Sequence, residues 1–155
     1  MSKAEYAVDC FNSGFNCSQA VFSSFSDTCG LDRKLALKIA GSFGGGMGHI
    51  GEACGAVTGA FLVIGMLYGQ EKEDDKYTKA MNYLRVQDFA SRFRRLNGAI
   101  RCKELLGYDL SDKEQLNAAR QTDVFETVCA KYVSDAVRIL EDMIAELSLA
   151  NNPAE

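Results

Sequence analysis

The chain has 155 residues, of which 47% are hydrophobic and 25% are charged, enough for one domain with its own core. Its formal net charge of −4 argues against a nucleic-acid partner, because phosphate binding needs a basic face. The longest apolar stretch, residues 53–68, is too short for a typical membrane span, so an integral membrane protein is not expected. Residues 1–5 hold no apolar signal-peptide core, and a cytoplasmic location is therefore expected.

The first third of the chain predicts three helices. Residues 2–5 have the spacing of a capping box ahead of apolar residues that recur at helical intervals. Asn16 predicts the start of a second helix, which would run to about residue 29 and end at Gly30. Asp32 can cap a third helix that continues to residue 40. Cys17 then lies in the first turn of the second helix, where the helix dipole favours a thiolate.

A glycine-rich loop and an apolar segment form the middle of the chain. Residues 41–51 include six glycines, which could form either a nest of N–H groups for an anion or cluster sulfurs, or a tight connector. No strand precedes the loop and no Gly-Lys-Ser/Thr follows it, so a nucleotide-binding loop is not expected. The helix predicted over residues 53–68 is apolar on nearly every side, which is typical of the buried centre of a bundle. Cys54 lies at its start and is expected to be the most thiolate-like cysteine.

The remaining segments also predict helices. A long amphipathic helix is expected from residue 74 or 75 to about 97, with an inward face of Tyr77, Ala80, Met81, Leu84 and Phe93. A short helix over residues 100–106 carries Cys102, and residues 111–114 form another capping box. The last helix would begin at residue 122 or 123, with Cys129 on its inward apolar stripe.

The predicted fold class is accordingly all-α. No segment alternates as a strand does, and we expect a compact multi-helix bundle in which a buried central apolar helix follows the Gly-rich loop. A single helical domain is expected over residues 1–150, and residues 151–155 are expected to form a flexible tail. The apolar helical faces exceed what one small bundle needs to bury, so a homodimer with an isologous interface is expected.

The six cysteines contain no Cys-x-x-Cys pair, which excludes a thioredoxin or zinc-ribbon motif. Cysteine is often a small buried hydrophobe, and this interpretation fits Cys10 and Cys29. The other four cysteines are scattered over four predicted helices, and side chains placed in this way can converge in a bundle core.

The pattern of these four cysteines resembles that of the redox-active protein family named C_GCAxxG_C_C. The run CGAVTG at residues 54–59 is similar to the central motif, and Cys17, Cys102 and Cys129 resemble the first, third and fourth cysteines. The resemblance extends over about residues 4–145. It implies a compact helical fold and a redox role, and a similar domain occurs in split-Soret-type cytochromes, which transfer electrons. It also implies that these cysteines are the catalytic or cofactor-binding residues, with an iron–sulfur cluster as one cofactor.

Three hypotheses follow for Cys17, Cys54, Cys102 and Cys129. In the first, they serve a redox partner, either as the four thiolate ligands of an iron–sulfur cluster or as a dithiol that cycles to a disulfide. In the second, they bind zinc or a soft metal such as copper. In the third, the chain is a helical interaction domain and the cysteines belong only to its core. His49, the only histidine, could be a further ligand or a base, although a lone loop histidine is more often simply exposed.

Overall fold

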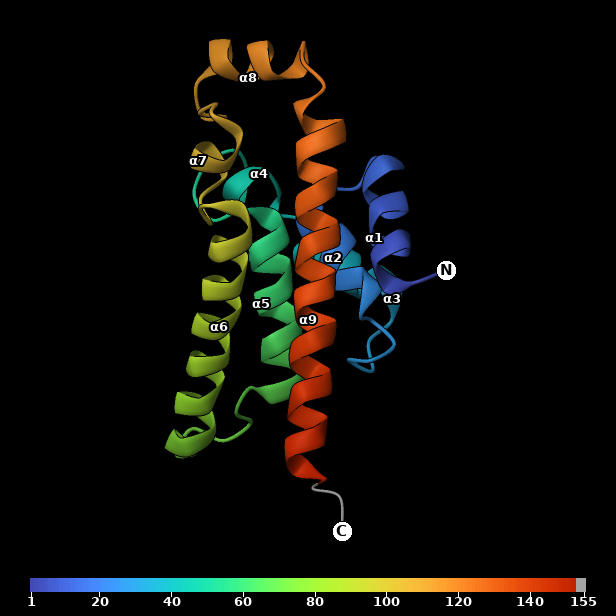
Figure 1. Cartoon of the computed structure of the whole chain (residues 1–155), viewed down its shortest axis with the longest axis vertical. Coiled ribbons are helices and arrows are strands. Elements are labelled where there is room, and N and C mark those ends of the chain that lie inside the picture. Colours follow the sequence, from blue (N-terminus) through green and yellow to red (C-terminus); the bar gives the residue numbers. More distant parts are fainter. Residues whose placement is uncertain (153–155) are drawn as a thin grey trace.

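The computed structural model describes residues 1–152, and almost all of its regular structure is helical (Figure 1). Within this range no strand forms, and the one isolated β-bridge joins Ala53 to Arg101. The all-α prediction is therefore confirmed. In chain order the elements are α1 (Lys3–Asn12), α2 (Cys17–Ser24), α3 (Arg33–Ala40), α4 (Gly44–Met47), α5 (Gly55–Tyr68), α6 (Lys76–Asn97), α7 (Cys102–Leu106), α8 (Lys113–Arg120), the π-helical turn η1 (Phe125–Cys129) and α9 (Ala130–Asn151).

Helix α5 is the buried centre of the bundle, as its composition predicts. It packs against α2, α6 and α9, while α1 packs on α2 and α9 (Figure 1). Ala56, Val57, Ala60 and Val63 of α5 are completely buried. The first turns of α2 and α5 lie at the same end of this packed core as α4 and α7, and α8 crosses above that end (Figure 1).

Local capping sets the starts of the first two helices. The Glu5 amide donates to Ser2 Oγ over 3.1 Å, and the Ser2 amide donates back to the Glu5 carboxylate over 2.7 Å. At α2 the Gln19 amide donates to Asn16 Oδ1 over 2.9 Å, and the Asn16 amide donates to Gln19 Oε1 over 3.0 Å. Both are reciprocal capping boxes. The second one fixes Cys17 as the first residue of α2.

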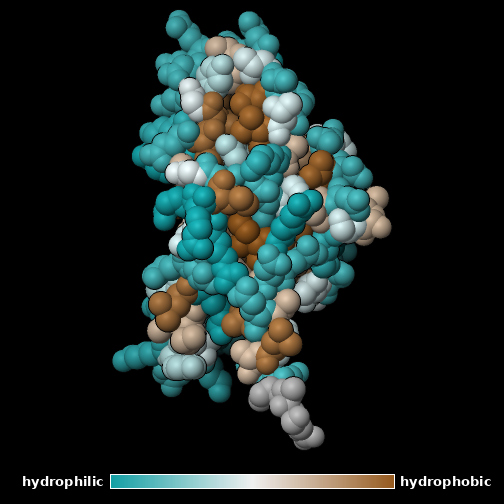
Figure 2. Space-filling view, in the orientation of Figure 1, coloured by the Kyte–Doolittle hydropathy of each residue, from teal (hydrophilic) through white to brown (hydrophobic). Residues whose placement is uncertain are grey.

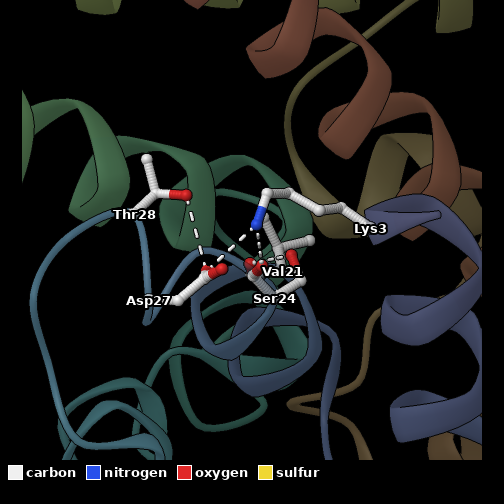
Figure 3. A network of polar contacts seen from close by, with 5 residues as sticks. All are labelled: Lys3, Val21, Ser24, Asp27 and Thr28. Atoms are coloured by element: carbon white, nitrogen blue, oxygen red, sulfur yellow. Dashed lines mark hydrogen bonds and ion pairs between the residues drawn. The ribbon is translucent and has the colours of Figure 1, made fainter. Parts of the chain in front are cut away.

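Helix α2 ends at Ser24, earlier than the predicted end near residue 29. Lys3 Nζ donates to the Ser24 carbonyl over 3.1 Å and forms an ion pair with Asp27 over 3.0 Å (Figure 3). A cation that contacts the last carbonyls of a helix satisfies groups with no partner within the helix. The chain then continues through turns to Gly30, which has a positive φ and lies outside the helix.

The predicted inward face of α6 is wrong in its first half. Tyr77 is 77% exposed and Leu84 is 55% exposed, and Ala80 is exposed as well. The rotation of the helix is set by Phe89 and Phe93, whose fully buried rings pack 6.1 Å apart, centroid to centroid. On the preceding turns the half-buried residues, in place of Tyr77 and Leu84, are Thr78, Met81, Asn82, Arg85 and Val86.

Two later boundaries also differ from the sequence prediction. The cap of α8 is Asp112, which accepts from the Gln115 amide over 2.9 Å, so the capping residue lies one position after the predicted one. The predicted last helix begins with the π turn η1 before it continues as α9. Of the predicted tail, Asn151 still belongs to α9, and residues 153–155 lie outside the described residues. Between residues 1 and 152, no helix is long and apolar enough to cross a membrane.

Candidate functional site

A cavity of about 140 Å³ lies where the starts of α2, α5 and α7 meet α4 and the π turn. All four cysteines of the predicted site line it, whereas Cys10 and Cys29 lie elsewhere. The lining residues are Phe11, Asn16, Cys17, Gly45, His49, Cys54, Gly55, Cys102, Leu105, Leu106, Leu110, Phe125, Cys129 and Tyr132. The structure thus brings together residues from five parts of the chain in the arrangement that the sequence predicted for the cysteines.

The glycine-rich loop forms a left-handed helical turn beside the cavity. The residues from Gly45 to His49 all have φ between 65° and 69°. Left-handed backbone is strained for residues with a Cβ, by roughly 1–2 kcal/mol each, and here Met47 and His49 adopt it as well as the glycines. A hydrogen bond from the Gly45 amide of this turn contributes to the lowered pKa of Cys17. The loop therefore supplies a hydrogen-bond donor to Cys17.

Two glycines of the CGAxxG run let α5 approach α2 closely. A Cβ on Gly55 would collide with the sulfur of Cys17. One turn later, a Cβ on Gly59 would lie 2.8 Å from the Ser18 carbonyl oxygen. Residues four apart lie on one face of a helix, so the two glycines form a single smooth contact surface. This contact brings Cys17 next to Cys54.

A short stretch of backbone pairing joins Cys54 to Cys102. The Cys54 amide donates to the Ile100 carbonyl over 2.8 Å, and the Cys102 amide donates to the Glu52 carbonyl over 2.6 Å. The Arg101 guanidinium forms two hydrogen bonds of 3.1 Å with the Glu52 carboxylate across the same pairing. Glu52 is thus engaged by an arginine, which argues against its use as a base for a thiol. No signal in the sequence links these two distant segments.

The thiols of Cys17 and Cys54 form an interacting pair in which the proton stays on Cys54. The Cys54 thiol donates a hydrogen bond to the sulfur of Cys17, and with the backbone amides of Gly45 and Ser18 this lowers the pKa of Cys17 to about 7, against the opposing effect of burial. The negative sulfur of Cys17, together with burial, raises the pKa of Cys54. Hydrogen bonds to a charged group favour that charged form.

The expectation that Cys54 is the most thiolate-like cysteine is therefore wrong. Cys54 is the N-cap of α5 rather than a residue of its first turn, and the hydrogen bond from the Ala56 amide lowers its pKa less than Cys17 and burial raise it. Cys54 is also 6% exposed, while Cys17 is partly exposed. The thiolate is the nucleophilic form, so Cys17 is the cysteine suited to attack.

Cys102 and Cys129 line the same cavity, but their pKa values are raised, whereas that of Cys17 is lowered. Burial and the nearby negative sulfur of Cys17 raise the pKa of Cys102 to about 12. The same two causes raise the pKa of Cys129. Both are therefore neutral thiols near pH 7. Cys129 ends the π turn, a form of helix that is often found at functional sites.

Several lining residues were not singled out as site residues from the sequence, among them Tyr132, Phe125 and Asn16. Tyr132 donates from its hydroxyl to the Leu105 carbonyl over 3.2 Å, and Phe125 opens the π turn. Both lie on the inward stripe of the last helix, which marks them only as core residues. Asn16 is visible in the sequence as a helix cap, and it lines the cavity as well. His49 is exposed and also contributes to the lining.

The fit of a metal or cluster can be judged from the positions of the possible ligands. A four-thiolate site requires its sulfurs to converge on one point. Across residues 1–152, no three side chains of His, Cys, Asp or Glu gather closely enough to hold a metal ion. The four cysteines surround a space rather than a point, so the arrangement as it stands does not fit such a group, and no step is derived through one.

Comparison with known protein families identifies the family of the chain. A family model described as "Putative redox-active protein (C_GCAxxG_C_C)" matches residues 15–143, a range that includes all four lining cysteines. That label writes glycine before cysteine in its central motif, whereas this chain has Cys54 before Gly55. Neither a curated protein nor a solved structure matches the chain.

Proposed function

Because the chain belongs to the C_GCAxxG_C_C family of redox-active proteins, we propose that it carries out thiol–disulfide exchange through Cys17 and Cys54. One observation carries this proposal: Cys17 and Cys54 line one cavity as an interacting pair, in which hydrogen bonds from the Cys54 thiol and from the Gly45 and Ser18 amides lower the pKa of Cys17 to about 7. A stabilised thiolate beside a second, protonated thiol is the arrangement that exchange requires.

The exchange proceeds in two displacements. The Cys17 thiolate attacks one sulfur of a substrate disulfide, forms a mixed disulfide and expels the other substrate sulfur as a thiolate. Cys54 gives its proton to that leaving sulfur, attacks Cys17 and releases the second substrate sulfur. Two electrons pass to the substrate, and a Cys17–Cys54 disulfide remains in the protein. The burial of Cys54 suits a resolving thiol, because only the adjacent Cys17 needs to reach it.

Cys102 and Cys129 are assigned a later role in the same cavity. Their thiols are protonated near neutral pH, so they do not compete with Cys17 for the substrate. They can take over the disulfide from the first pair by further exchange, since they line the same space. This would return Cys17 and Cys54 to the reduced form.

The test is to oxidise the reduced, metal-free protein with a small disulfide and to map the cysteines by non-reducing mass spectrometry. A disulfide between Cys17 and Cys54 is expected. Cys17→Ser should abolish the reaction, because the attacking thiolate is missing. Cys10→Ser and Cys29→Ser are matched controls that should react as the wild type does. A mixed disulfide should accumulate in Cys54→Ser, because the resolving thiol is missing.

Metal analysis distinguishes this proposal from the alternatives. Protein purified without oxygen should be colourless and contain no stoichiometric iron or zinc. A brown protein whose four cavity cysteines resist alkylation would instead favour an iron–sulfur centre, and a colourless one with bound zinc would favour a metal-binding module. If no cysteine of the folded protein reacts, the four belong only to the core and the exchange proposal fails.

A further inference from the structure

We propose that the substrate of this exchange is a small, neutral, apolar disulfide that enters the cavity, and not a protein disulfide or a charged peptide disulfide such as glutathione. This inference rests on the proposed function and names its substrate class. It follows from three properties of the cavity: the side chains of its wall, the state of its polar groups, and its volume.

The wall of the cavity is apolar. None of the described residues that line it is an aspartate, glutamate, lysine or arginine. Besides the cysteines, most of its large side chains are hydrophobic or aromatic: Phe11, Leu105, Leu106, Leu110, Phe125 and Tyr132. Hydrophobic side chains also lie at the surface between α7 and α9, below α8 (Figure 2). A charged ligand in the cavity would lose its water without gaining a counter-ion, which is costly.

Apart from His49, which is exposed, and the cysteines, the polar side chains at the cavity are already engaged within the protein. Asn16 donates from Nδ2 to the Gly41 carbonyl over 3.0 Å, and its Oδ1 accepts from the Gln19 amide. The Tyr132 hydroxyl donates to the Leu105 carbonyl. These groups are committed to the fold, so they provide no set of donors for carboxylates such as those of glutathione.

The space inside the cavity accommodates about one ring. The cavity measures about 140 Å³. An apolar cavity of about 150 Å³ in another protein holds one benzene molecule. A five-membered cyclic disulfide is of comparable size, whereas glutathione disulfide and a protein surface loop are far larger. The sulfur of such a ring would meet Cys17, whose own sulfur lies at the wall beside Gly55.

The reaction with such a ring is balanced. The Cys17 thiolate opens the ring by attacking one of its sulfurs, and the other ring sulfur takes the proton from Cys54. Cys54 then attacks Cys17 and releases the ring sulfur that was bound to it. The ring disulfide is reduced to a dithiol carrying one thiol and one thiolate, and the protein dithiol is oxidised to a disulfide. The ring stays neutral until it has been opened, so no charge has to enter the wall.

The experiment compares two substrates that share one ring. The probes are a dithiolane carboxamide, which is neutral, and the corresponding dithiolane carboxylate, with glutathione disulfide as a large charged comparison. The reduced protein should react with the amide at least about tenfold faster than with the carboxylate, because the wall offers the anion no lysine or arginine. Free dithiothreitol, which has no cavity, provides the intrinsic ratio and should show little difference between the two rings.

A filling substitution tests whether the ring enters the cavity. Leu105→Trp should slow the amide reaction by about tenfold or more, because the larger side chain occupies the space. Leu149→Trp is the matched control, since Leu149 is 72% exposed on α9, and should leave the rate unchanged. Circular dichroism of both variants checks that they fold. Toluene added to the wild-type protein gives a readout without redox chemistry, and should shift the amide resonances of Leu105 and Phe125.

The outcomes separate this inference from the proposed function. Equal rates for the amide and carboxylate rings, or no toluene shifts at the cavity, would overturn the substrate class while leaving exchange at Cys17 intact. The substrate class would also be overturned if the protein reduced glutathione disulfide as fast, relative to the amide ring, as dithiothreitol does. Absence of any Cys17–Cys54 disulfide with every oxidant would instead overturn the proposed function, and toluene binding could still be observed.

Discussion

The sulfur of Cys17 occupies the space into which a Cβ on Gly55 would project. The glycine after Cys54 is thus required by a cysteine of another helix rather than by the conformation of its own helix. Because the two helices meet backbone to backbone here, a single methyl group is enough to separate the reactive thiols.

We expect Gly55→Ala to move the sulfur of Cys17 away from that of Cys54. The methyl group should displace the Cys17 sulfur and cost about 1–3 kcal/mol of unfolding free energy by overpacking. Gly65→Ala is the matched control on the same helix, because no atom lies within 4 Å of its added Cβ. That control should stabilise the protein by up to about 1 kcal/mol through helix propensity. Urea unfolding and alkylation of Cys17 measure both effects, and equal behaviour of the two variants would contradict the close contact.

The pH dependence of alkylation should single out Cys17. Its pKa of about 7 means that the thiolate, the reactive form, is half populated near pH 7 and decreases as the pH falls below that value. Labelling of the reduced protein with iodoacetamide, read residue by residue, should therefore show a midpoint near neutrality for Cys17. Cys29 should label only at higher pH, because burial and Asp27 raise its pKa.

Replacement of Cys54 should move that midpoint upward. Cys54→Ala removes the thiol that makes the largest contribution to the lowered pKa of Cys17, so more alkaline conditions are needed to form the thiolate. Cys10→Ala serves as a control at a buried cysteine outside the cavity. A midpoint that stays near pH 7 in Cys54→Ala would mean that the backbone amides alone stabilise the thiolate.

The left-handed turn should store strain that glycine relieves. Met47 has φ of 68°, so Met47→Gly is expected to raise the free energy of unfolding by up to about 1 kcal/mol. Met66→Gly is the control: it has similar exposure but lies within α5, where glycine should cost about 1 kcal/mol. Thermal and urea unfolding measure both. A loss of stability in Met47→Gly would show that its side chain contributes packing that outweighs the backbone strain.

The exposed apolar side chains of α6 support our proposal of a homodimer. Tyr77 and Leu84 are seven residues apart and lie on one side of the helix, both more than half exposed. Leu84→Glu should convert a dimer to a monomer, because the carboxylate would be buried without a partner. Leu149→Glu, at an exposed leucine of α9, is the control. Light scattering at micromolar concentration measures the mass, and a monomeric wild-type protein would contradict the proposal.

Features fixed by local rules could be predicted from the sequence. The caps at Ser2 and Asn16 depend on side chains within three residues, and the structure contains both as expected. The apolar composition of the segment that follows Cys54 likewise predicted a central buried helix. Periodicity alone did not fix the rotation of α6, because it is set by Phe89 and Phe93 against other helices.

The electrostatics of the candidate site could not be predicted in the same way. A cysteine at a helix start suggests a thiolate, and both Cys17 and Cys54 fit that description. Their different pKa values depend first on the hydrogen bond between the two thiols and then on the backbone amides that reach each sulfur, and the Gly45 amide comes from a turn with unusual backbone. Such long-range donors leave no pattern in the sequence around Cys17.

The π turn from Phe125 to Cys129 begins the last helix, and both of these residues line the cavity. A π turn holds one residue more than an α-helical turn, so the start of the turn is offset by roughly 100° relative to an uninterrupted extension of α9. An insertion or deletion of one residue at this point can therefore be absorbed by the turn, while the packed residues of α9 keep their neighbours. The cavity wall and the bundle core can thus vary in length independently, although they belong to one continuous helix.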